Sequence, residues 1–172
     1  MDRIELARPG MAITLNGLAQ GYAADVALAA VRAHGIEHAL LDTGEFAVRG
    51  RKHGQPLTLG VRAPRDPQAP AATLRLDGRA MATSGDYEMA FTPDYLHHHI
   101  FDPKAGYSPP QLAGVTVLAH SAMLADGLAT ACMVLGADKA MALAARLPGV
   151  HLLAIDKAGL AWRSAGFPPE AA

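Results

Sequence analysis

The chain contains one long, almost wholly apolar run at residues 122–135, with Ser121 before it and Gly136 after it. Serine is a favoured N-cap and glycine is favoured just past a helix end, so the run predicts a helix with both ends marked. Apolar residues recur there at helical spacing and predict one buried stripe, made of Leu124, Leu128, Ala131 and Leu135. We therefore expect the rest of the chain to be organised around this helix.

Two polar side chains, Asp126 and Thr130, interrupt the apolar run. They lie four residues apart, so they share a helix face other than the predicted stripe. A carboxylate that is buried must be paired, hydrogen-bonded or bound to a metal ion. Carboxylate and hydroxyl oxygens suit Mg²⁺ better than Zn²⁺. On these residues alone a second interpretation stays open, in which Asp126 is a salt-bridged structural residue and Thr130 bonds back to its own helix.

Composition narrows the class of protein. A length of 172 residues suits a single domain with a real core. The net charge of −1 and the absence of a Lys/Arg run argue against nucleic-acid or membrane-surface binding. The single cysteine, Cys132, lies in the apolar run and is expected in the core, without a disulfide in the chain. No apolar stretch approaches the roughly 20 residues of a membrane-spanning helix, and the first residues lack a signal-peptide core, so the chain as written is expected in the cytoplasm.

A glycine- and alanine-rich stretch runs from Leu15 to Asp25. We expect a strand at residues 11–15, a turn at Asn16-Gly17 and a helix at residues 18–34 that Gly35 closes. Small residues at a helix start let a ligand approach, and the free N–H groups there can bind a phosphate. Tight packing against another backbone is the alternative explanation for the same glycines.

Short segments between turn residues predict strands, and one of them, at residues 57–62, alternates in polarity. They lie at residues 38–42, 46–49, 57–62, 73–76, 80–83, 115–119, 150–155 and 160–163. Asp77-Gly78 predicts a hairpin between residues 73–76 and 80–83. The polar, glycine-containing turn expected at residues 84–88, which begins with Ser84 and Gly85, is a common place for ligand contacts.

The remaining segments complete the predicted fold. A further helix is expected at residues 138–147, residues 150–155 and 160–163 are expected to form a closing hairpin, and the tail at 167–172 is expected to fray. Hairpins combined with three helices predict an α+β fold, with helices packed on a largely antiparallel sheet.

Three consecutive histidines, His97 to His99, stand in the run from Tyr95 to Gly106. In an extended segment neighbours point to alternate faces, so His97 and His99 are expected on one side and His98 on the other. The chain has no Cys/His set at zinc-ligand spacing, which argues against a zinc site. One histidine acting as a base is the functional interpretation, and a hydrogen-bonded structural histidine is the alternative.

Four motifs occur in order along the chain. They are Asn16-Gly-Leu-Ala-Gln-Gly-Tyr-Ala-Ala-Asp25, Ala82-Thr-Ser-Gly85, His99-Ile-Phe-Asp-Pro-Lys-Ala-Gly106 and Ala125-Asp-Gly-Leu-Ala-Thr130. Together they resemble the ApbE family, the FAD:protein FMN transferases. Gln20 and the Thr43-Gly-Glu45 variant resemble the NosX-like branch, which is associated with nitrous oxide reduction. The resemblance covers essentially the whole chain but only the C-terminal half to two thirds of the family pattern.

The resemblance implies an activity and its cofactors. Family members use Mg²⁺ to split FAD and transfer FMN to a threonine hydroxyl of a flavin-carrier protein, with release of AMP. By this resemblance Asp126 and Thr130 are metal ligands through their side chains, and Gly17 is one through its carbonyl. His99 matches the proposed general base.

The resemblance also places the FAD contacts. They fall on Thr14, Asn16, Gln20, Ser84, Gly85 and Phe101. The chain departs from the family pattern where Thr14 replaces an Asp, where Gln20 replaces a charged residue, and where Ala105 replaces a frequent Thr.

The N-terminal part of the family pattern has no counterpart in the single domain at residues 1–172. If such a part precedes Met1, the protein is expected in the periplasm, because family members are often exported or membrane-anchored. The expected partners are FAD and a flavin-carrier protein, and a homodimer could cover exposed apolar surface. A non-catalytic flavin-binding or interaction domain derived from the family is the alternative function.

Overall fold

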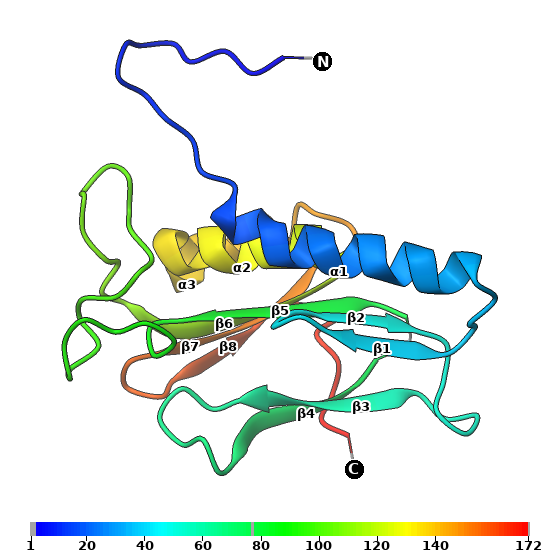
Figure 1. Cartoon of the computed structure of the whole chain (residues 1–172). Coiled ribbons are helices and arrows are strands. Elements are labelled where there is room, and N and C mark those ends of the chain that lie inside the picture. Colours follow the sequence, from blue (N-terminus) through cyan, green and yellow to red (C-terminus); the bar gives the residue numbers. More distant parts are fainter. Residues whose placement is uncertain (1–2, 77, 172) are drawn as a thin grey trace.

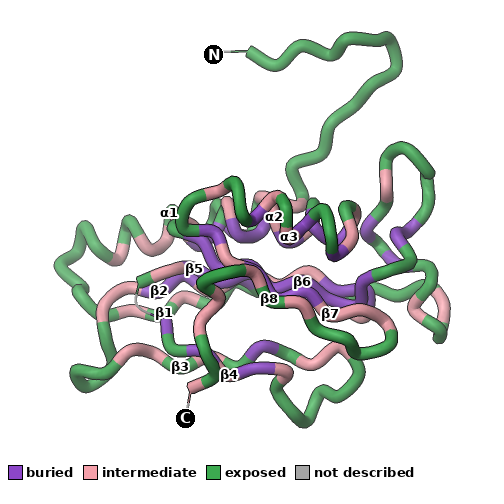
Figure 2. Tube along the Cα trace, turned by 180° about the vertical axis from the view of Figure 1, so that it is seen from behind, coloured by how far each residue is buried: buried purple, intermediate pink, exposed green. Residues whose placement is uncertain are grey.

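The fold is built in three layers (Figure 1; Figure 2). The computed structural model describes residues 3–76 and 78–171, and within these residues three helices cover one face of a six-stranded sheet. A separate two-stranded sheet covers the other face (Figure 1). All strand pairs are antiparallel, so the predicted α+β fold is confirmed.

The elements have the following bounds. The helices are α1 (Asn16–Ala33), α2 (Ala122–Leu135) and α3 (Ala137–Ala144). The larger sheet runs in the order β1 (Ala39–Asp42), β2 (Phe46–Arg49), β5 (Ala80–Gly85), β6 (Leu112–Ala119), β7 (His151–Asp156) and β8 (Ala161–Arg163). The smaller sheet pairs β3 (Leu57–Arg62) with β4 (Pro70–Leu76). Within the described residues, no helix has the length and apolar content that crossing a bilayer requires.

The central strand β6 contributes to a core cluster on each of its two faces. All of its residues are buried, as expected for a strand that is covered on both faces. Val115 and Val117 pack under the helices, whereas Leu118 packs with Leu74 and Leu76 of the smaller sheet. The larger sheet therefore stands between two cores, and the helix side carries the candidate site.

The ends of α2 are as predicted, but its buried face is not. Ser121 Oγ accepts a hydrogen bond from Leu124 N at 3.3 Å, and Gly136 ends the helix with φ 77°. Leu124 and Leu128 of the predicted stripe are only half-buried, and Ala131 and Leu135 are exposed. The buried face consists mainly of small residues, namely Ala122, Ala125, Ala129 and Cys132, together with Met133 and Asp126. Small residues occupy this face because α2 packs closely against both α1 and the sheet, which leaves little room for larger side chains.

The first helix begins at Asn16, so the predicted turn at Asn16-Gly17 is wrong. The strand predicted at residues 11–15 is also wrong, because this segment has no regular structure and leads away from the body of the molecule (Figure 1). A weak alternation cannot make a strand without a neighbour to pair with its backbone. Helix α1 instead crosses α2 closely, since a Cβ atom at Gly21 would overlap the Ala122 carbonyl.

The predicted hairpin between residues 73–76 and 80–83 is wrong. Strand β4 pairs with β3, while β5 pairs with β2 and β6 in the other sheet. Asp77 lies outside the described residues, and the chain passes from one layer to the other between Leu76 and Ala80. Burial of Leu74 and Leu76 between the layers outweighs the local turn signal.

The end of the chain is ordered across the smaller sheet. Phe167 packs on the cluster between the two sheets, and Ala171 N donates to Thr73 O at 2.7 Å. The expected fraying is therefore wrong for the described part of the tail. The closing hairpin is confirmed as β7 and β8, whereas α3 ends at Ala144 rather than at residue 147.

Candidate active site

The crossing of α1 and α2 brings together the residues predicted to bind metal. Asp126 is 5% exposed, and its Oδ2 accepts a hydrogen bond from Gly21 N at 3.0 Å. A Cβ atom at Gly17 would lie 3.4 Å from Thr130 Oγ1. The same Thr130 oxygen lies 3.0 Å from Ser84 Oγ at the end of β5. Side chains far apart in the sequence thus meet at one point under the start of α1.

Among the residues that it describes, the structure shows neither a salt bridge to Asp126 nor a hydrogen bond from Thr130 back to its own helix, the two structural interpretations that the sequence left open. No ion pair with Asp126 occurs within the described part of the chain, and Thr130 bonds to Ser84 across the helix–sheet boundary. Burial raises the pKa of Asp126, and the Gly21 N–H partly opposes that rise. An ionised Asp126 here lacks a neighbouring counter-charge, so a cation would relieve its desolvation.

The donor set fits a hard cation better than a soft one. In a regular helix Gly21 N–H bonds to the Gly17 carbonyl, and here it donates to Asp126. The Gly17 carbonyl oxygen would lie 3.8 Å from a Cβ atom at Gly127, so it faces α2. Within the described residues no group of three or more His, Cys, Asp or Glu side chains could hold a metal ion. A metal held here would rely on one carboxylate, one hydroxyl and one carbonyl, with positions left for ligand oxygens.

Sequence reasoning missed a second buried carboxylate, Glu45. It is 6% exposed, and its Oε2 accepts from Thr83 N at 3.2 Å. Burial, and then the charge of Asp126, raise the pKa of Glu45 to about 8. An acidic residue placed directly before the apolar strand β2 was the available signal. Glu45 therefore belongs to the same acidic centre as Asp126.

Gln20 ties the start of α1 to the turn before Glu45. Its Nε2 donates to Thr43 O at 3.3 Å, and Thr43 Oγ1 donates to Gln20 O at 3.4 Å. Thr14 and Asn16 stand at the exposed start of the helix, where Thr14 Oγ1 accepts from Asn16 N at 3.2 Å. Of the predicted FAD contacts, Gln20 thus lies against the turn before Glu45, while Thr14 and Asn16 lie at the exposed start of α1.

The histidine run alternates as predicted. His98 is fully buried, while His97 and His99 are exposed. His98 N donates to Ser108 Oγ at 2.8 Å, and burial lowers the pKa of the His98 ring. His98 Nδ1 has no hydrogen-bond partner within the described residues. His98 is therefore held inside its segment, whereas the side chain of His99 is exposed.

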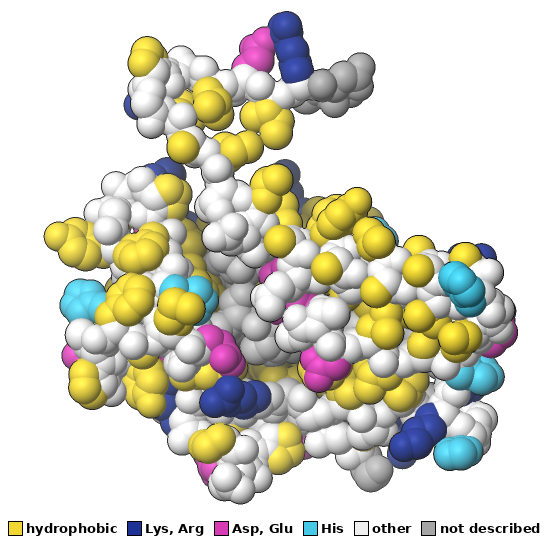
Figure 3. Space-filling model, viewed as in Figure 1, with side chains coloured by type: hydrophobic (Ala, Val, Ile, Leu, Met, Phe, Trp, Pro, Cys, Tyr) yellow, Lys and Arg dark blue, Asp and Glu magenta, His cyan; other side chains and the backbone are white. Residues whose placement is uncertain are grey.

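His99 and Phe101 lie on the 86–111 lobe, the part of the chain between β5 and β6. His99 N donates to Met89 O at 3.1 Å, and Phe101 stacks on Phe91 with 6.3 Å between ring centroids. Among the described residues no hydrogen bond joins His99 to Asp126 or Thr130. Figure 3 shows a hollow between this lobe and the helix layer, with acidic side chains along its wall. The predicted base thus lies on the lobe, whereas the predicted metal ligands lie at the α1–α2 crossing.

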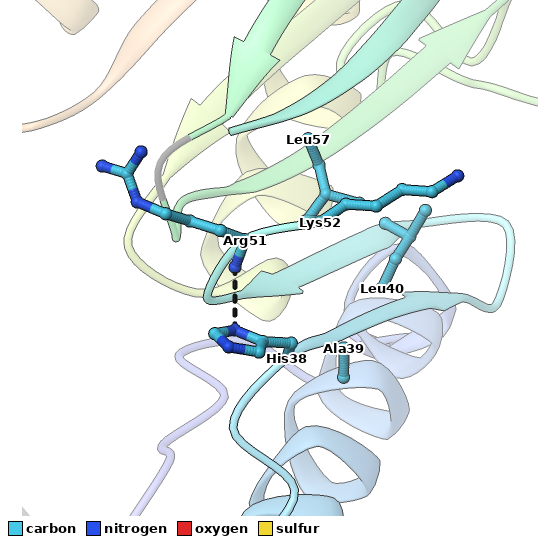
Figure 4. A pocket seen from close by; sticks show the side chains of 6 residues that line it. All are labelled: His38, Ala39, Leu40, Arg51, Lys52 and Leu57. Atoms are coloured by element: carbon cyan, nitrogen blue, oxygen red, sulfur yellow. Dashed lines mark hydrogen bonds between the residues drawn. The ribbon is translucent and has the colours of Figure 1, made fainter. Parts of the chain in front are cut away.

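A surface pocket of about 220 Å³ lies elsewhere, between the start of β1 and the turn before β3 (Figure 4). His38 Nδ1 accepts from Arg51 N at 3.0 Å on its floor, and Leu40, Lys52 and Leu57 line it. None of the predicted site residues belongs to it, and it carries no carboxylate. It is not the candidate site.

A sequence model of the ApbE family matches residues 1–154. The chain belongs to the ApbE family. The predicted resemblance is therefore confirmed at the level of the family. Membership of the NosX-like branch stays a prediction.

Named ApbE relatives agree in sequence and in structure. The FAD:protein FMN transferase of Treponema pallidum is 36% identical over 166 residues, which cover 88% of this chain and 46% of the relative. The ApbE protein of Thermotoga maritima superposes with a TM-score of 0.81 at 34% identity, covering 89% of this chain and 51% of that one. The flavin transferase ApbE of Vibrio cholerae gives a TM-score of 0.79 at 32% identity, covering 95% and 54%. The chain thus spans about half the length of the ApbE relatives that it matches.

Proposed function

We propose that this chain carries the site of a Mg²⁺-dependent FAD:protein FMN transferase. The site would transfer FMN from FAD to a threonine hydroxyl of a flavin-carrier protein and release AMP. The observation that carries the proposal is the meeting of Gly17, Asp126 and Thr130 at the α1–α2 crossing. Family membership supports the reaction class, because the Treponema pallidum and Vibrio cholerae relatives bear that name.

In this proposal Mg²⁺ would be held by the Gly17 carbonyl and by the side chains of Asp126 and Thr130. When bound, the ion would neutralise charge on the pyrophosphate of FAD. The chain itself holds these ligands in place: the Gly21 N–H orients the Asp126 carboxylate, and the Ser84 hydroxyl orients that of Thr130.

The base assignment follows from exposure. The acceptor threonine oxygen forms a bond to the FMN phosphorus, and the bond from that phosphorus to the AMP oxygen breaks. The threonine proton passes to the ring of His99, which is exposed, whereas His98 is buried in the lobe. AMP leaves with the electron pair of the broken bond.

We further assign the chain to the NosX-like branch of the family. Gln20 and the Thr43–Glu45 turn are the two departures that support this assignment, and they contact each other. A Cβ atom at Gly44 would lie 3.1 Å from Gln20 Nε2, so the turn at residues 43–45 packs closely against the Gln20 side chain.

The reaction can be tested directly. Purified chain is incubated with FAD, MgCl₂ and a flavin-carrier protein, while AMP is measured by liquid chromatography and the carrier by intact mass. We expect AMP and FMN-modified carrier in equal amounts, and neither product with Asp126→Ala. Asp138→Ala, on the exposed side of α3, is the matched control and should keep both products. Flavin fluorescence quenching without AMP would instead support a flavin-binding domain, and no interaction with FAD would refute both functions.

A further inference from the structure

A buried charge cluster adjoins the candidate site, and the proposed function gives it no role. It centres on Asp86, whose side chain is 0% exposed and which directly follows Ser84 and Gly85. Arg65 binds both carboxylate oxygens, at 2.7 Å for each N–O pair. Lys157, from the turn between β7 and β8, binds Asp86 Oδ2 at 2.7 Å. Two cations from separate loops therefore share one buried carboxylate.

The same cluster holds Tyr95, which lies just before the three histidines. Lys157 Nζ donates to Tyr95 O at 2.6 Å, and the Arg65 guanidinium lies 4.1 Å from the centre of the Tyr95 ring. Tyr95 has φ 59°, a left-handed conformation that residues with a Cβ atom rarely adopt. Such a conformation persists only where the surroundings over-determine it. Lys157 and Arg65 provide that constraint.

Both limbs of the lobe start at this cluster. One limb leaves from Asp86 and the other passes through Tyr95, and they are joined by two backbone hydrogen bonds. Phe91 N donates to His97 O at 2.7 Å, and His99 N donates to Met89 O at 3.1 Å. The position of His99 is therefore tied through short, hydrogen-bonded segments to the carboxylate that follows Ser84.

The cluster consists of Arg65, Asp86, Tyr95 and Lys157, and we refer to it as the Asp86 clamp. Buried ion pairs add little stability over apolar groups of the same size, because desolvation offsets their attraction. What two cations on one carboxylate do supply is a defined geometry in which directions and distances are set.

We propose that the Asp86 clamp is a positioning device that sets where His99 stands relative to Ser84. In this role its residues act on His99 through the lobe. The inference rests on the proposed function for what His99 does, but not for where His99 is held.

The test uses the full chain with Lys157→Met, which leaves Asp86 paired with Arg65. Amide hydrogen exchange at Phe91 and His99 reports on the two limbs without any need for activity. We expect exchange at these two amides to be at least about tenfold faster, with no change in α2. We also expect kcat for FMN transfer to fall roughly 10²-fold while KM for FAD stays within about threefold.

Two further variants complete the set. Lys157→Arg keeps the charge and should restore most of both readouts, and Lys139→Met, on the exposed side of α3, should match the wild type. If Lys157→Met does not fold, Arg65→Lys gives the same readouts, because it keeps the charge but loses the two-pronged contact.

The outcomes separate the two proposals. Equal acceleration of exchange over the whole chain, or no acceleration at Phe91 and His99, would overturn the positioning role. Wild-type protein that releases no AMP would refute the proposed function alone, and the exchange rates would still decide whether the clamp holds His99.

Discussion

Asp126 and Glu45 are two carboxylates that the fold buries close enough for one charge to act on the other. Burial comes first in raising the pKa of each, and the Asp126 charge adds to the shift at Glu45. Both carboxyl groups favour the protonated form when no metal is bound. A cation that binds there would displace protons, so metal binding would be coupled to proton release. The acidic centre should therefore be visible in stability measurements before any activity is assayed.

Glu45→Gln should change how stability depends on pH. The folded-state pKa of Glu45 is about 8, against an ordinary value of 4.5, so the folded chain holds a proton that the unfolded chain releases. This contribution to stability is complete below pH 4.5 and is lost as pH rises through 8, by up to about 1.4 kcal/mol per pH unit. Urea unfolding between pH 5 and 9 with EDTA present should show a flatter curve for Glu45→Gln, with the variant more stable than wild type at the alkaline end. Glu5→Gln, at an exposed glutamate, is the control, and parallel curves for wild type and Glu45→Gln would refute the assignment.

The three histidines should separate by role. His99→Ala should lower FMN transfer by roughly 10²–10⁴-fold and keep FAD binding, because a general base contributes about that much. His97→Ala should leave both unchanged, since His97 is exposed and its ring has no assigned role. His98→Ala should lower the thermal midpoint, because His98 is buried and its ring contacts Pro109 O. The measurements are transfer rate, FAD affinity and thermal unfolding. Equal loss of transfer in all three variants would make the segment structural, and loss of FAD affinity without loss of maximal rate would make His99 a ligand contact.

At the scale of elements, the α1–α2 crossing builds the acidic centre. Gly21 lets the two helices touch, and its N–H holds Asp126. Asp25, one turn further along α1, accepts from Ala122 N and Met123 N at 2.8 and 2.9 Å and so caps α2 from outside. Each helix thus supplies backbone or side-chain partners that the other needs.

Gly21→Ala should separate these helices. The added methyl group would overlap the Ala122 carbonyl, and overpacking of this kind lowers the free energy of unfolding by about 1–3 kcal/mol. The shift would also weaken the hydrogen bond from Gly21 N that orients Asp126. Mg²⁺ should therefore stabilise this variant less than the wild type. Thermal unfolding with and without MgCl₂ measures both effects. Ala30→Leu adds carbons on the exposed side of α1 and serves as the control, and a Gly21→Ala variant as stable as wild type would show that the crossing can relax.

At the scale of the molecule, one sheet serves two cores. The helix side carries the site, and the smaller sheet with the tail closes the opposite face. Exposed apolar residues form a row that starts at Leu15, just before α1, and continues along the helix at Tyr22 and Val26. Figure 3 shows hydrophobic side chains gathered over the helix. The homodimer stays a prediction, and this row is the surface that a second copy would cover.

Phe167→Ala tests whether the tail holds the layers together. Phe167 is half-buried in the cluster between the sheets, so its loss should lower the free energy of unfolding by about 1–2 kcal/mol. Urea unfolding gives the value, and proteolysis should become faster in β3 and β4 but not in α2. Leu160→Ala, at a residue 59% exposed in the β7–β8 turn, is the comparison. A Phe167→Ala chain that unfolds like this control would restore the expectation of a frayed tail.

Local chemistry alone determined the features that depend on near neighbours in the sequence. Ser121 and Gly136 mark the ends of α2 because capping involves only adjacent residues, and the bounds of β2 and β3 follow from short segments that turn residues enclose. The alternation of His97, His98 and His99 in exposure was also predicted, although the segment bends and only His98 forms an isolated bridge. The order of the four motifs was enough to indicate the family.

Tertiary structure decided what depends on which element packs where. The leucines of α2 lost the buried face to alanines, because the close approach of α1 and the sheet leaves room only for small side chains. Asp77-Gly78 predicted a hairpin, but the strands on either side of it pair in two separate sheets. Glu45 and Asp86 look like surface acids in the sequence, and only packing against distant segments buries them. Burial and long-range pairing act between residues far apart in the chain, so no local pattern could reveal them.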